Sequence, residues 1–369
     1  MPDLTKPSQA WSLTWDADWV TAVAWLGSSR RVAAGNNLGQ ILLWELPDKP
    51  GGDAPRPVAR LDGHTNVISR LAATPDGKTL ISSSYDHTIR FWAVPSKLPE
   101  ATEPITLNAS AIADAVRRKA NGAKAPPALE AKVGVLKPTR TLTEHKEWIV
   151  GMGMSRDGKA LISGDDGGHV IVWDVATGGV KARWKLAKGW AYAVALSPDA
   201  KQACVTERLP LVFDSGRHAA VKLWNAATGE VAEDLSAEKE FKGHHMSAAA
   251  YSPDGKTLAI LRGGESNGPS GKPVLVDPAT GKVLKDPAPG HLDGGTDLAW
   301  HPDGHHLASA GRDTTVRVWD TATGKLVSEV GKGRGGQFKD WICAVSWSAD
   351  GNWLAAADMA GAVQIWAFN

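Results

Sequence analysis

The sequence predicts an all-β protein made of seven repeated units, and three observations support this prediction. Asp-Gly turns recur between alternating apolar runs, as in "ATPDGKTLISSS", "YSPDGKTLAILR" and "WHPDGHHLASAG". Alternation on both sides of a short turn is typical of a hairpin between two half-buried strands. A further alternating run follows each hairpin and usually ends in Trp, as in "QILLW", "TIRFW" and "TVRVW". The composition agrees, because 39 Gly and 17 Trp combine many turn residues with many large aromatic ones.

The ends of the third runs give the length of the repeat. These ends are Trp44, Trp92, Trp173, Trp224, Val276, Trp319 and Trp366. Successive ends lie 43 to 52 residues apart, except for the 81 residues from Trp92 to Trp173. An insertion over residues 95–141, rich in Pro and Ala, explains the long spacing. An apolar stripe from Ile112 to Ala120 predicts one short helix in it. The insertion is either a docking arm or a loop that covers a blade.

Two units carry a more specific pattern, "LDGHTNVISRLAATPDGKTLISSSYDHTIRFW" and "PGHLDGGTDLAWHPDGHHLASAGRDTTVRVWD". In this pattern and period, residues 11–369 resemble the WD-repeat β-propeller family, and the turns resemble those of its bacterial members. The resemblance implies a single seven-bladed propeller with four-stranded antiparallel blades around a central channel. It also implies that the N-terminal strand, Ala10 to Trp15, completes the last blade and closes the ring. Closure hides two strand edges that would otherwise pair with other chains.

The same resemblance assigns one group of polar residues to the fold. In the family, a His, a Ser, an Asp and a Trp form a buried hydrogen-bonded set in a blade. The matching residues are His64, Ser82, Asp86 and Trp92 in blade two, and His291, Ser309, Asp313 and Trp319 in blade six. Blades one, three and seven have a different turn, with Asn36, Asp165 or Asp358 before a Gly, so we do not expect the full set there. Because mutual hydrogen bonds explain these residues, we expect no catalytic triad.

One position at the start of each unit's first strand is not explained by the fold and is a candidate for binding a partner. Aligning the units on their hairpins places it eight residues before the turn's Pro or its equivalent. Trp occupies it in four units, and an acid precedes three of these Trp residues: Asp18, Trp19, Glu147, Trp148, Trp190, Asp340 and Trp341. The resemblance places the position on the top face, at the mouth of the channel. Four Trp rings of roughly 150 to 250 Å² each would make an apolar patch of several hundred Å².

We therefore expect a protein or peptide to bind the top face through a partial Trp ring; burial of the rings under neighbouring loops is the alternative. Further contact residues expected on this face are Tyr85, Phe213 and Arg312. Phe213 belongs to an apolar loop, residues 207–218, that is either a contact loop or a lid on its own blade.

Composition and motifs argue against several other functions. A formal net charge of +1 offers no overall field for nucleic acid or anionic lipid. No basic and apolar leader begins the chain, so we expect a cytoplasmic protein, or an exported one whose leader was removed. We also expect the propeller to be a monomer. His244, His245, His301, His305 and His306 raise the question of a metal, but no carboxylate or Cys stands at a convincing ligand spacing, and we expect none.

Two other functional classes remain open. The turns "DVATGG", "NAATGE" and "DTATGK" resemble those of quinoprotein dehydrogenases, although no carboxylate group for a cofactor site can be assigned and no cofactor is expected. A propeller that binds a glycan or small ligand at the channel mouth is the third reading, because Trp stacks well on sugar rings. A non-enzymatic interaction scaffold, possibly within a larger complex, remains the leading interpretation.

Overall fold

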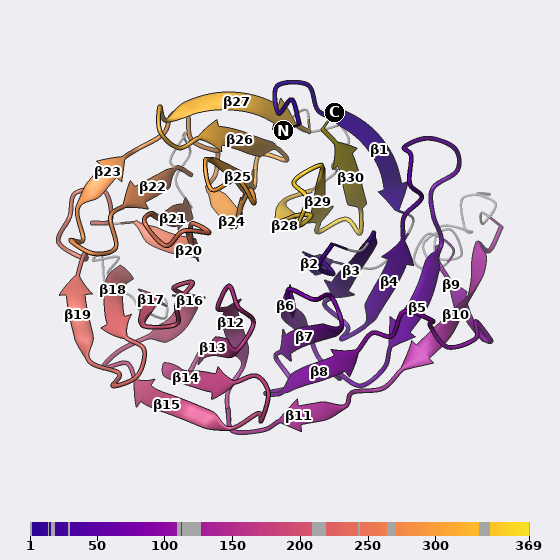
Figure 1. Cartoon of the computed structure of the whole chain (residues 1–369), viewed down its shortest axis with the longest axis horizontal. Helices are drawn as coiled ribbons and strands as arrows, with labels where there is room; N and C mark the ends of the chain where they lie inside the picture. The colour runs from indigo at the N-terminus through magenta and orange to yellow at the C-terminus, as the bar shows by residue number, and fades with distance from the viewer. Residues whose placement is uncertain are drawn as a thin grey trace, which may run out of the picture.

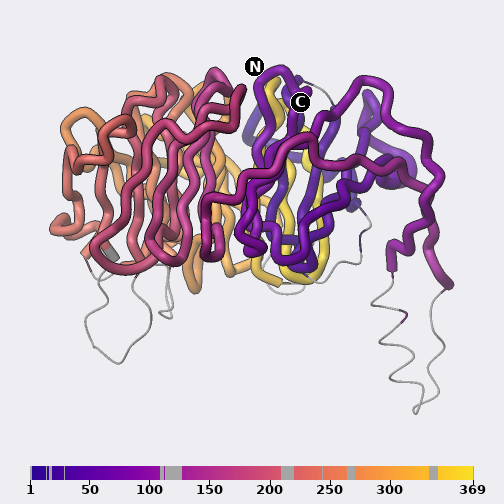
Figure 2. The backbone as a smooth tube through the Cα atoms, turned by 90° about the horizontal axis from the view of Figure 1, so that it is seen from below, coloured from indigo at the N-terminus to yellow at the C-terminus, as the bar shows by residue number. Residues whose placement is uncertain are grey.

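The strands form a ring of seven blades around a central channel, which confirms the predicted seven-bladed β-propeller (Figure 1). The computed structural model describes residues 2–13, 15, 19–28, 30–108, 112, 127–208, 219–242, 244–263, 271–331 and 340–368. Each blade has its innermost strand at the channel and its other strands farther out (Figure 1). Figure 2 shows the ring from its edge.

The two inner positions of each blade form the hairpins that the Asp-Gly turns predict. The innermost strands, in blade order, are β2 (Val20–Trp25), β6 (Ile68–Ala73), β12 (Ile149–Met154), β16 (Trp190–Leu196), β20 (His245–Tyr251), β24 (Gly295–Trp300) and β28 (Ile342–Trp347). The second strands are β3 (Arg31–Asn36), β7 (Thr79–Ser84), β13 (Ala160–Asp165), β17 (Gln202–Arg208), β21 (Leu258–Gly263), β25 (His306–Gly311) and β29 (Trp353–Asp358).

The third and fourth strands complete the blades. The third strands, which contain the repeated Trp, are β4 (Ile41–Glu45), β8 (Ile89–Ala93), β14 (His169–Asp174), β18 (Ala219–Asn225), β22 (Pro273–Val276), β26 (Val316–Asp320) and β30 (Val363–Ala367). The fourth strands are β5 (Pro57–Leu61), β11 (Arg140–Leu142), β15 (Val180–Lys185), β19 (Val231–Asp234), β23 (Val283–Lys285), β27 (Lys325–Val330) and, in blade seven, β1 (Ser8–Leu13).

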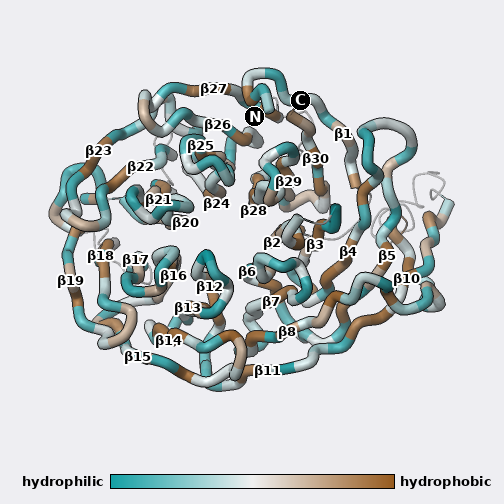
Figure 3. Tube along the Cα trace, viewed as in Figure 1, coloured by the Kyte–Doolittle hydropathy of each residue, from teal (hydrophilic) through white to brown (hydrophobic). Residues whose placement is uncertain are grey.

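The hydrophobic core lies between the blades, because both faces of a blade pack against neighbours. Along β4, Leu42 and Trp44 belong to the cluster shared with blade seven, whereas Ile41 and Leu43 belong to the cluster shared with blade two. Successive side chains of a strand point to opposite faces, so one apolar run serves two interfaces. Hydrophobic residues accordingly recur along the strands, and hydrophilic residues gather at the turns (Figure 3).

Trp side chains on the innermost strands join neighbouring blades by hydrogen bonds as well as by packing. The indole Nε1–H of Trp25 donates to the carbonyl oxygen of Ser346 in blade seven at 3.1 Å. Trp300 makes the equivalent bond to the carbonyl of Ala250 in blade five at 2.9 Å. These bonds link blade one to blade seven and blade six to blade five, whereas Nε1 of the equivalent Trp347 has no hydrogen-bond partner among the described residues and its ring packs on His301 and Phe368.

The N-terminal strand closes the ring as predicted. Strand β1 pairs antiparallel with β30, from Ser8 opposite Ala367 to Leu13 opposite Val363. Trp11 of this strand stacks on Trp353 of blade seven, with ring centroids 5.5 Å apart. The two ends of the chain consequently lie near each other in the same blade (Figure 1).

The segment between β8 and β11 departs from the expected blade of four strands. Strand β10 (Glu130–Leu136) pairs in parallel with β5, and β9 (Glu103–Thr106) pairs antiparallel with β10. Blade one therefore has six strands, and the inserted pair covers an edge that β5 would otherwise expose. The helix expected after Ser110 falls outside the described residues, apart from Ile112. No helix in the described part of the chain is long and apolar enough to cross a membrane.

The buried polar set is present in blades two and six. In blade six the indole of Trp319 donates to Ser309 Oγ at 2.8 Å, and Ser309 Oγ lies 2.7 Å from His291 Nε2. The other ring nitrogen, Nδ1, lies 2.9 Å from Asp313 Oδ1. Because an indole can only donate, the hydroxyl donates onward to Nε2 and the Nδ1–H donates to the carboxylate. Blade two repeats this arrangement with His64, Ser82, Asp86 and Trp92.

Blade three also contains a full set, so the expectation that it lacks one was wrong. His145 lies 2.7 Å from both Ser163 Oγ and Asp165 Oδ2, and the indole of Trp173 donates to Ser163 at 2.8 Å. The Asp comes two residues after the Ser here, whereas Asp86 comes four residues after Ser82. The carboxylate reaches the same imidazole from the end of β13, while Gly168 at φ 80° makes the turn. His145 was missed because Glu144, not Gly, precedes it.

These sets predict a loss of stability in acid. Burial raises the pKa of Asp313, but the hydrogen bond and charge of His291, the Thr315 hydroxyl and the charge of Arg317 together outweigh burial and lower this pKa to about 2 from 3.8. The pKa of Asp86 is also lowered, and burial lowers the pKa of His64. All three pKa values are lower in the folded chain than in the unfolded chain, so in acid the unfolded chain binds more protons. This difference begins near pH 6.5 for His64 and near pH 3.8 for the two Asp residues. Lowering the pH therefore lowers the stability of the fold.

We expect the melting temperature to fall most steeply between about pH 4 and pH 2, where Asp313 alone contributes about 2 kcal/mol. Thermal melts from pH 7 to pH 2 measure this effect. Asp313→Asn should melt at a lower temperature at pH 7 and show a shallower slope in acid. Parallel pH profiles for the two proteins would contradict this assignment.

Candidate protein-interaction surface

The backbone places the predicted Trp positions at equivalent points around one mouth of the channel. In five blades, the residue before the innermost strand accepts a backbone hydrogen bond, at 2.9 or 3.0 Å, from the turn between the second and third strands. The accepting and donating pairs are Trp19 and Asn37, Val67 and Tyr85, Trp148 and Asp166, Gly294 and Arg312, and Trp341 and Met359. In blades four and five, the strand register assigns this position to Trp190 and His245. These seven residues define the position that we call the mouth position.

Three of the four Trp residues at the mouth position are exposed. Trp19, Trp148 and Trp341 expose 49%, 48% and 38% of their surface, and no other Trp in the described chain is classed as exposed. Trp190 is half-buried. The alternative in which loops bury these rings therefore does not describe these three side chains. Fold stability does not explain such exposure, because the third-strand Trp residues already fill the spaces between blades.

Aromatic stacking links a turn of blade two to the mouth position of blade three. The rings of Tyr85 and Trp148 are parallel, with an interplanar angle of 1° and centroids 5.1 Å apart. Tyr85 lies in the turn that follows β7, and Trp148 precedes β12 of the next blade. The stack holds one face of the Trp148 ring against its neighbour while much of the ring stays accessible.

Arginine side chains lie over the rings of Trp341, Trp190 and Tyr192. The guanidinium carbon of Arg312 lies 4.5 Å from the centroid of the Trp341 ring, again across a blade boundary. Arg208 lies 5.1 Å from the Tyr192 ring and 5.7 Å from the Trp190 ring. Such cation–π contacts fix the orientation of both partners. Arg312 and Tyr85, expected only as weaker contacts, thus belong to the same cluster as the Trp residues.

The mouth itself contains a cavity of about 190 Å³. Every blade contributes to its lining the residue at the β-bulge of the innermost strand: Thr21, Ser69, Val150, Tyr192, Ser247, Thr296 and Cys343. The bulge adds one residue to the strand and turns its side chain toward the channel axis. The sequence signal was available, since these residues occupy the same place in every repeat, but alternation alone assigns them to no face.

Two charged residues stand in the channel among small ones. The residues after the bulges are Ala22, Arg70, Gly151, Ala193, Ala248, Asp297 and Ala344, and they line a cavity of about 250 Å³. Burial raises the pKa of Asp297, against the opposing effects of the Arg70 charge and the Val345 N–H, which donates to Asp297 at 3.0 Å. Arg70 lines both cavities. It therefore brings a positive charge to the floor of the mouth.

The acids next to the Trp residues are on the surface, as expected for residues beside accessible rings. Glu147 and Asp340 are exposed, and Asp340 Oδ1 accepts the backbone N–H of Trp341 at 2.7 Å. In blade three this role passes to Asp166, whose Oδ1 accepts the N–H of Trp148 at 3.0 Å. These bonds hold the backbone that carries each ring. Asp18, Phe213 and most of the apolar loop 207–218 lie outside the described residues.

Comparison with known proteins gives the family of the repeats. The family model "WD domain, G-beta repeat" matches residues 55–93, 136–174, 283–320 and 332–367. Four segments of the propeller thus match the WD40 repeat. Each match ends with the third strand of a blade. The three matches that end in blades two, three and six include the complete polar sets of those blades. The unmatched blades include blade five, where Val276 replaces the third-strand Trp.

Several curated proteins resemble this propeller over most of its length. Small ribosomal subunit protein RACK1y of Oryza sativa is 25% identical over 363 residues, which cover 83% of this chain and 94% of the rice protein. The guanine nucleotide-binding protein subunit beta of Arabidopsis thaliana is 25% identical over 327 residues, 84% of this chain and 82% of that protein. Nuclear distribution protein nudF of Emericella nidulans is 23% identical over 315 residues, with 79% and 67% covered.

These relatives are of a kind that generally acts in protein interaction, as scaffold or regulatory subunits. They come from eukaryotes, so they give no support to the bacterial resemblance of the turns. Neither the matches nor the identities point to one partner.

Proposed function

We propose that this propeller is a non-enzymatic scaffold that binds a protein or peptide across the channel mouth. The observation that carries the proposal is the exposure of Trp19, Trp148 and Trp341 at equivalent mouth positions of three blades. Trp is enriched among residues that dominate binding energy at interfaces, and contiguous exposed apolar surface commonly marks a binding site. WD40-repeat relatives that act through protein contacts support the same conclusion.

The rings are arranged in a way that favours tight binding. Tyr85 holds Trp148 by stacking, and Arg312 holds Trp341, so two of the anchors are oriented before a partner arrives. Ordering these side chains beforehand reduces the entropy lost on binding. Polar bulge residues and Arg70 lie below them in the mouth. A partner that lays an apolar segment across the rings and lowers a carboxylate toward Arg70 fits this surface.

Other functional classes have weaker support. The Ser, His and Asp residues of each buried set hydrogen-bond to one another within their blade. The "ATG" turns are stabilised by hydrogen bonds between residues of the same turn. In these turns Asp174 and Asp320 accept bonds from the backbone and hydroxyl of Thr177 and Thr323. Turn formation explains these residues without a quinone cofactor. The balanced charge of the chain favours a protein partner over nucleic acid.

Substitution of the mouth Trp residues tests the proposal. Affinity capture with the wild-type chain and a Trp148→Ala/Trp341→Ala variant should identify partners that are retained by the first and lost by the second. Each Trp at an interface hot spot contributes about 2 kcal/mol or more, so the dissociation constant of such a partner should rise about 30-fold or more per substitution. Titration of the purified partner measures this change.

A matched control removes exposed apolar side chains away from the mouth. Val231 and Leu284 expose 47% each on the outer strands β19 and β23. Val231→Ala/Leu284→Ala should therefore bind the partner as the wild type does. If the Trp variant folds normally and every captured partner binds it with unchanged affinity, the proposal fails.

A further inference from the structure

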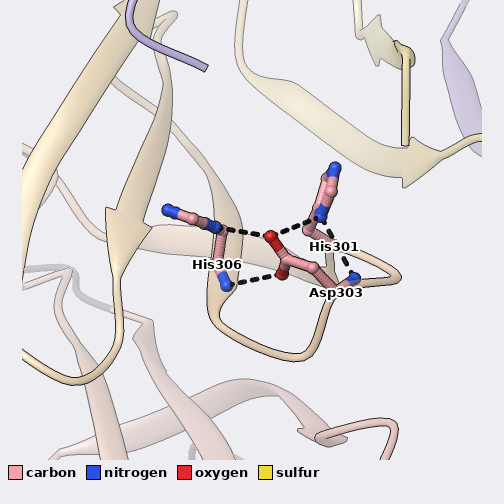
Figure 4. A group of neighbouring side chains, drawn as sticks. All are labelled: His301, Asp303 and His306. Carbon is pink, nitrogen blue, oxygen red and sulfur yellow. Dashed lines mark hydrogen bonds and ion pairs between the residues drawn. The ribbon is translucent and has the colours of Figure 1, made fainter. Parts of the chain in front are cut away.

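The hairpin turn between β24 and β25 brings two imidazoles to one carboxylate (Figure 4). Oδ2 of Asp303 lies 3.0 Å from Nδ1 of His301 and 2.8 Å from Nδ1 of His306. These three atoms all lie within 4.8 Å of one another. The turn is at the opposite end of β24 from the channel mouth. It is therefore separate from the surface described above.

Comparison with the other blades shows that this turn does not need histidine to form. In blades two, three, four, five and seven, a hydroxyl two residues before the turn Asp donates to its Oδ1: Thr74, Ser155, Ser197, Ser252 and Ser348. In blade six, His301 replaces that hydroxyl and His306 adds a second ring. The two histidines thus supply nitrogen ligands in a turn that other blades build without them.

Hydrogen bonds fix the orientation of His301. Its side chain is buried, with 3% exposed for the whole residue, and Nε2 lies 3.1 Å from the carbonyl oxygen of Gly351. Because a carbonyl only accepts, Nε2 bears the hydrogen and Nδ1 presents a lone pair. That lone pair accepts the Asp303 N–H at 3.2 Å and also faces Asp303 Oδ2. Two lone pairs at 3.0 Å repel each other, so either a proton on Nδ1 or a metal cation beside both atoms makes this approach favourable.

The neighbouring blade is shaped to hold this ring. Gly351 of blade seven has φ +74°, and a Cβ there would lie 2.3 Å from Nε2 of His301. The His301 and Trp347 rings also pack nearly perpendicular to each other, with centroids 4.8 Å apart. In a metal-bound histidine, the ring nitrogen that does not bind the metal usually donates to a backbone carbonyl or a carboxylate, as Nε2 of His301 does here. Blade seven therefore supplies the outer support of the site.

Asp303 keeps one carboxylate oxygen available. Its Oδ1 accepts the backbone N–H groups of His305 and His306 at 2.8 and 3.1 Å, whereas Oδ2 faces the two imidazoles. Oδ2 is thus the carboxylate oxygen left to face a cation between the two rings. Asp320 pairs with His306 across the hairpin and adds a second negative charge nearby.

We propose that His301 Nδ1, Asp303 Oδ2 and His306 Nδ1 bind a Zn²⁺ ion, with water as a further ligand. Two imidazoles and one carboxylate are a common protein set for this ion, and its nitrogen and oxygen ligands lie at about 2.0 to 2.2 Å. Tetrahedral ligands at these distances are about 3.4 Å apart, so the separations of 2.8 and 3.0 Å open by a few tenths of an ångström on binding. The expectation that these histidines lack a carboxylate overlooked Asp303, which the turn places between them. A bound ion would fix the turn of blade six in the position where His301 contacts the Gly351 carbonyl of blade seven.

Calorimetric titration of the metal-stripped chain with Zn²⁺ tests the site. We expect one ion to bind per chain and to raise the melting temperature, whereas Mg²⁺, which prefers six oxygen ligands, should do neither. His306→Ala should weaken Zn²⁺ binding more than about 10-fold, because loss of even an outer-shell partner costs about 10- to 100-fold. His301→Ser restores the hydroxyl found in the other blades, so it should fold and yet lose the ion.

His305→Ala is the matched control, since His305 is exposed on the same turn but outside the cluster. It should bind Zn²⁺ as the wild type does. Two results would overturn the proposal: no stoichiometric binding by the wild type, or equal binding by the His305→Ala and His306→Ala variants. The second result would assign any bound ion to other histidines of the chain.

Discussion

Removal of residues 1–15 should lower the melting temperature by more than about 10 °C or leave the chain unable to fold. The segment supplies the outer strand of blade seven and buries Leu4, Trp11, Leu13 and Trp15, each at most 6% exposed. Burial of a large apolar side chain contributes about 1.5 to 3 kcal/mol, so these four together contribute about 6 to 12 kcal/mol. That sum is comparable with the whole stability of many proteins, about 5 to 15 kcal/mol. Circular dichroism melts measure the change.

Complementation separates the role of the strand from the effect of shortening the chain. A synthetic peptide of residues 1–15, added to the truncated protein, should raise its melting temperature by pairing with the free edge of β30. The same peptide with Trp11→Ala should restore less, because it cannot stack on Trp353. An unchanged melting temperature after truncation would contradict closure by β1.

The fold could be predicted because a similar pattern of residues recurs in all seven repeats. A Trp at the end of a third strand and an Asp-Gly turn in the hairpin are local signals, and their recurrence fixes the number of blades. The partners of β9 and β10 could not be predicted, since nothing in residues 103–136 specifies the outer edge of the preceding blade. Blade three shows the same limit: Asp165 and His145 meet because the strands bring them together, not because their spacing matches Asp86 and His64.

The candidate surface was predictable in part for a similar reason. Alignment of the repeats identified Trp19, Trp148 and Trp341, because the position recurs. It could not reveal that Tyr85 stacks on Trp148 or that Arg312 covers Trp341, since both contacts cross from one blade to the next. Arg70 was missed because alternation describes a flat strand, and a bulge alters which residues face the channel. His301 was noted, but its partner Asp303 was taken for an ordinary turn residue.

Trp319→Ala should reduce the free energy of unfolding by about 3 to 5 kcal/mol, the usual cost of deleting a buried aromatic side chain. Trp319 has no exposed surface, and its indole is the first donor in the chain of hydrogen bonds through Ser309 and His291 to Asp313. Chemical denaturation measures the loss. Trp319→Phe removes the donor together with part of the ring volume, and the polar set that it leaves incomplete should account for about 1 to 3 kcal/mol of its cost.

Trp44 provides the matched control for this hydrogen bond. It occupies the same third-strand position in blade one and is also fully buried, but its Nε1 has no hydrogen-bond partner among the described residues. Trp44→Phe therefore removes a similar volume without breaking a polar set, and relieves a buried N–H of its desolvation cost. The difference in unfolding free energy between the Trp319→Phe and Trp44→Phe variants isolates the contribution of the donor. Equal losses would show that the repeated Trp is retained for packing alone, and that the polar sets tolerate a missing donor.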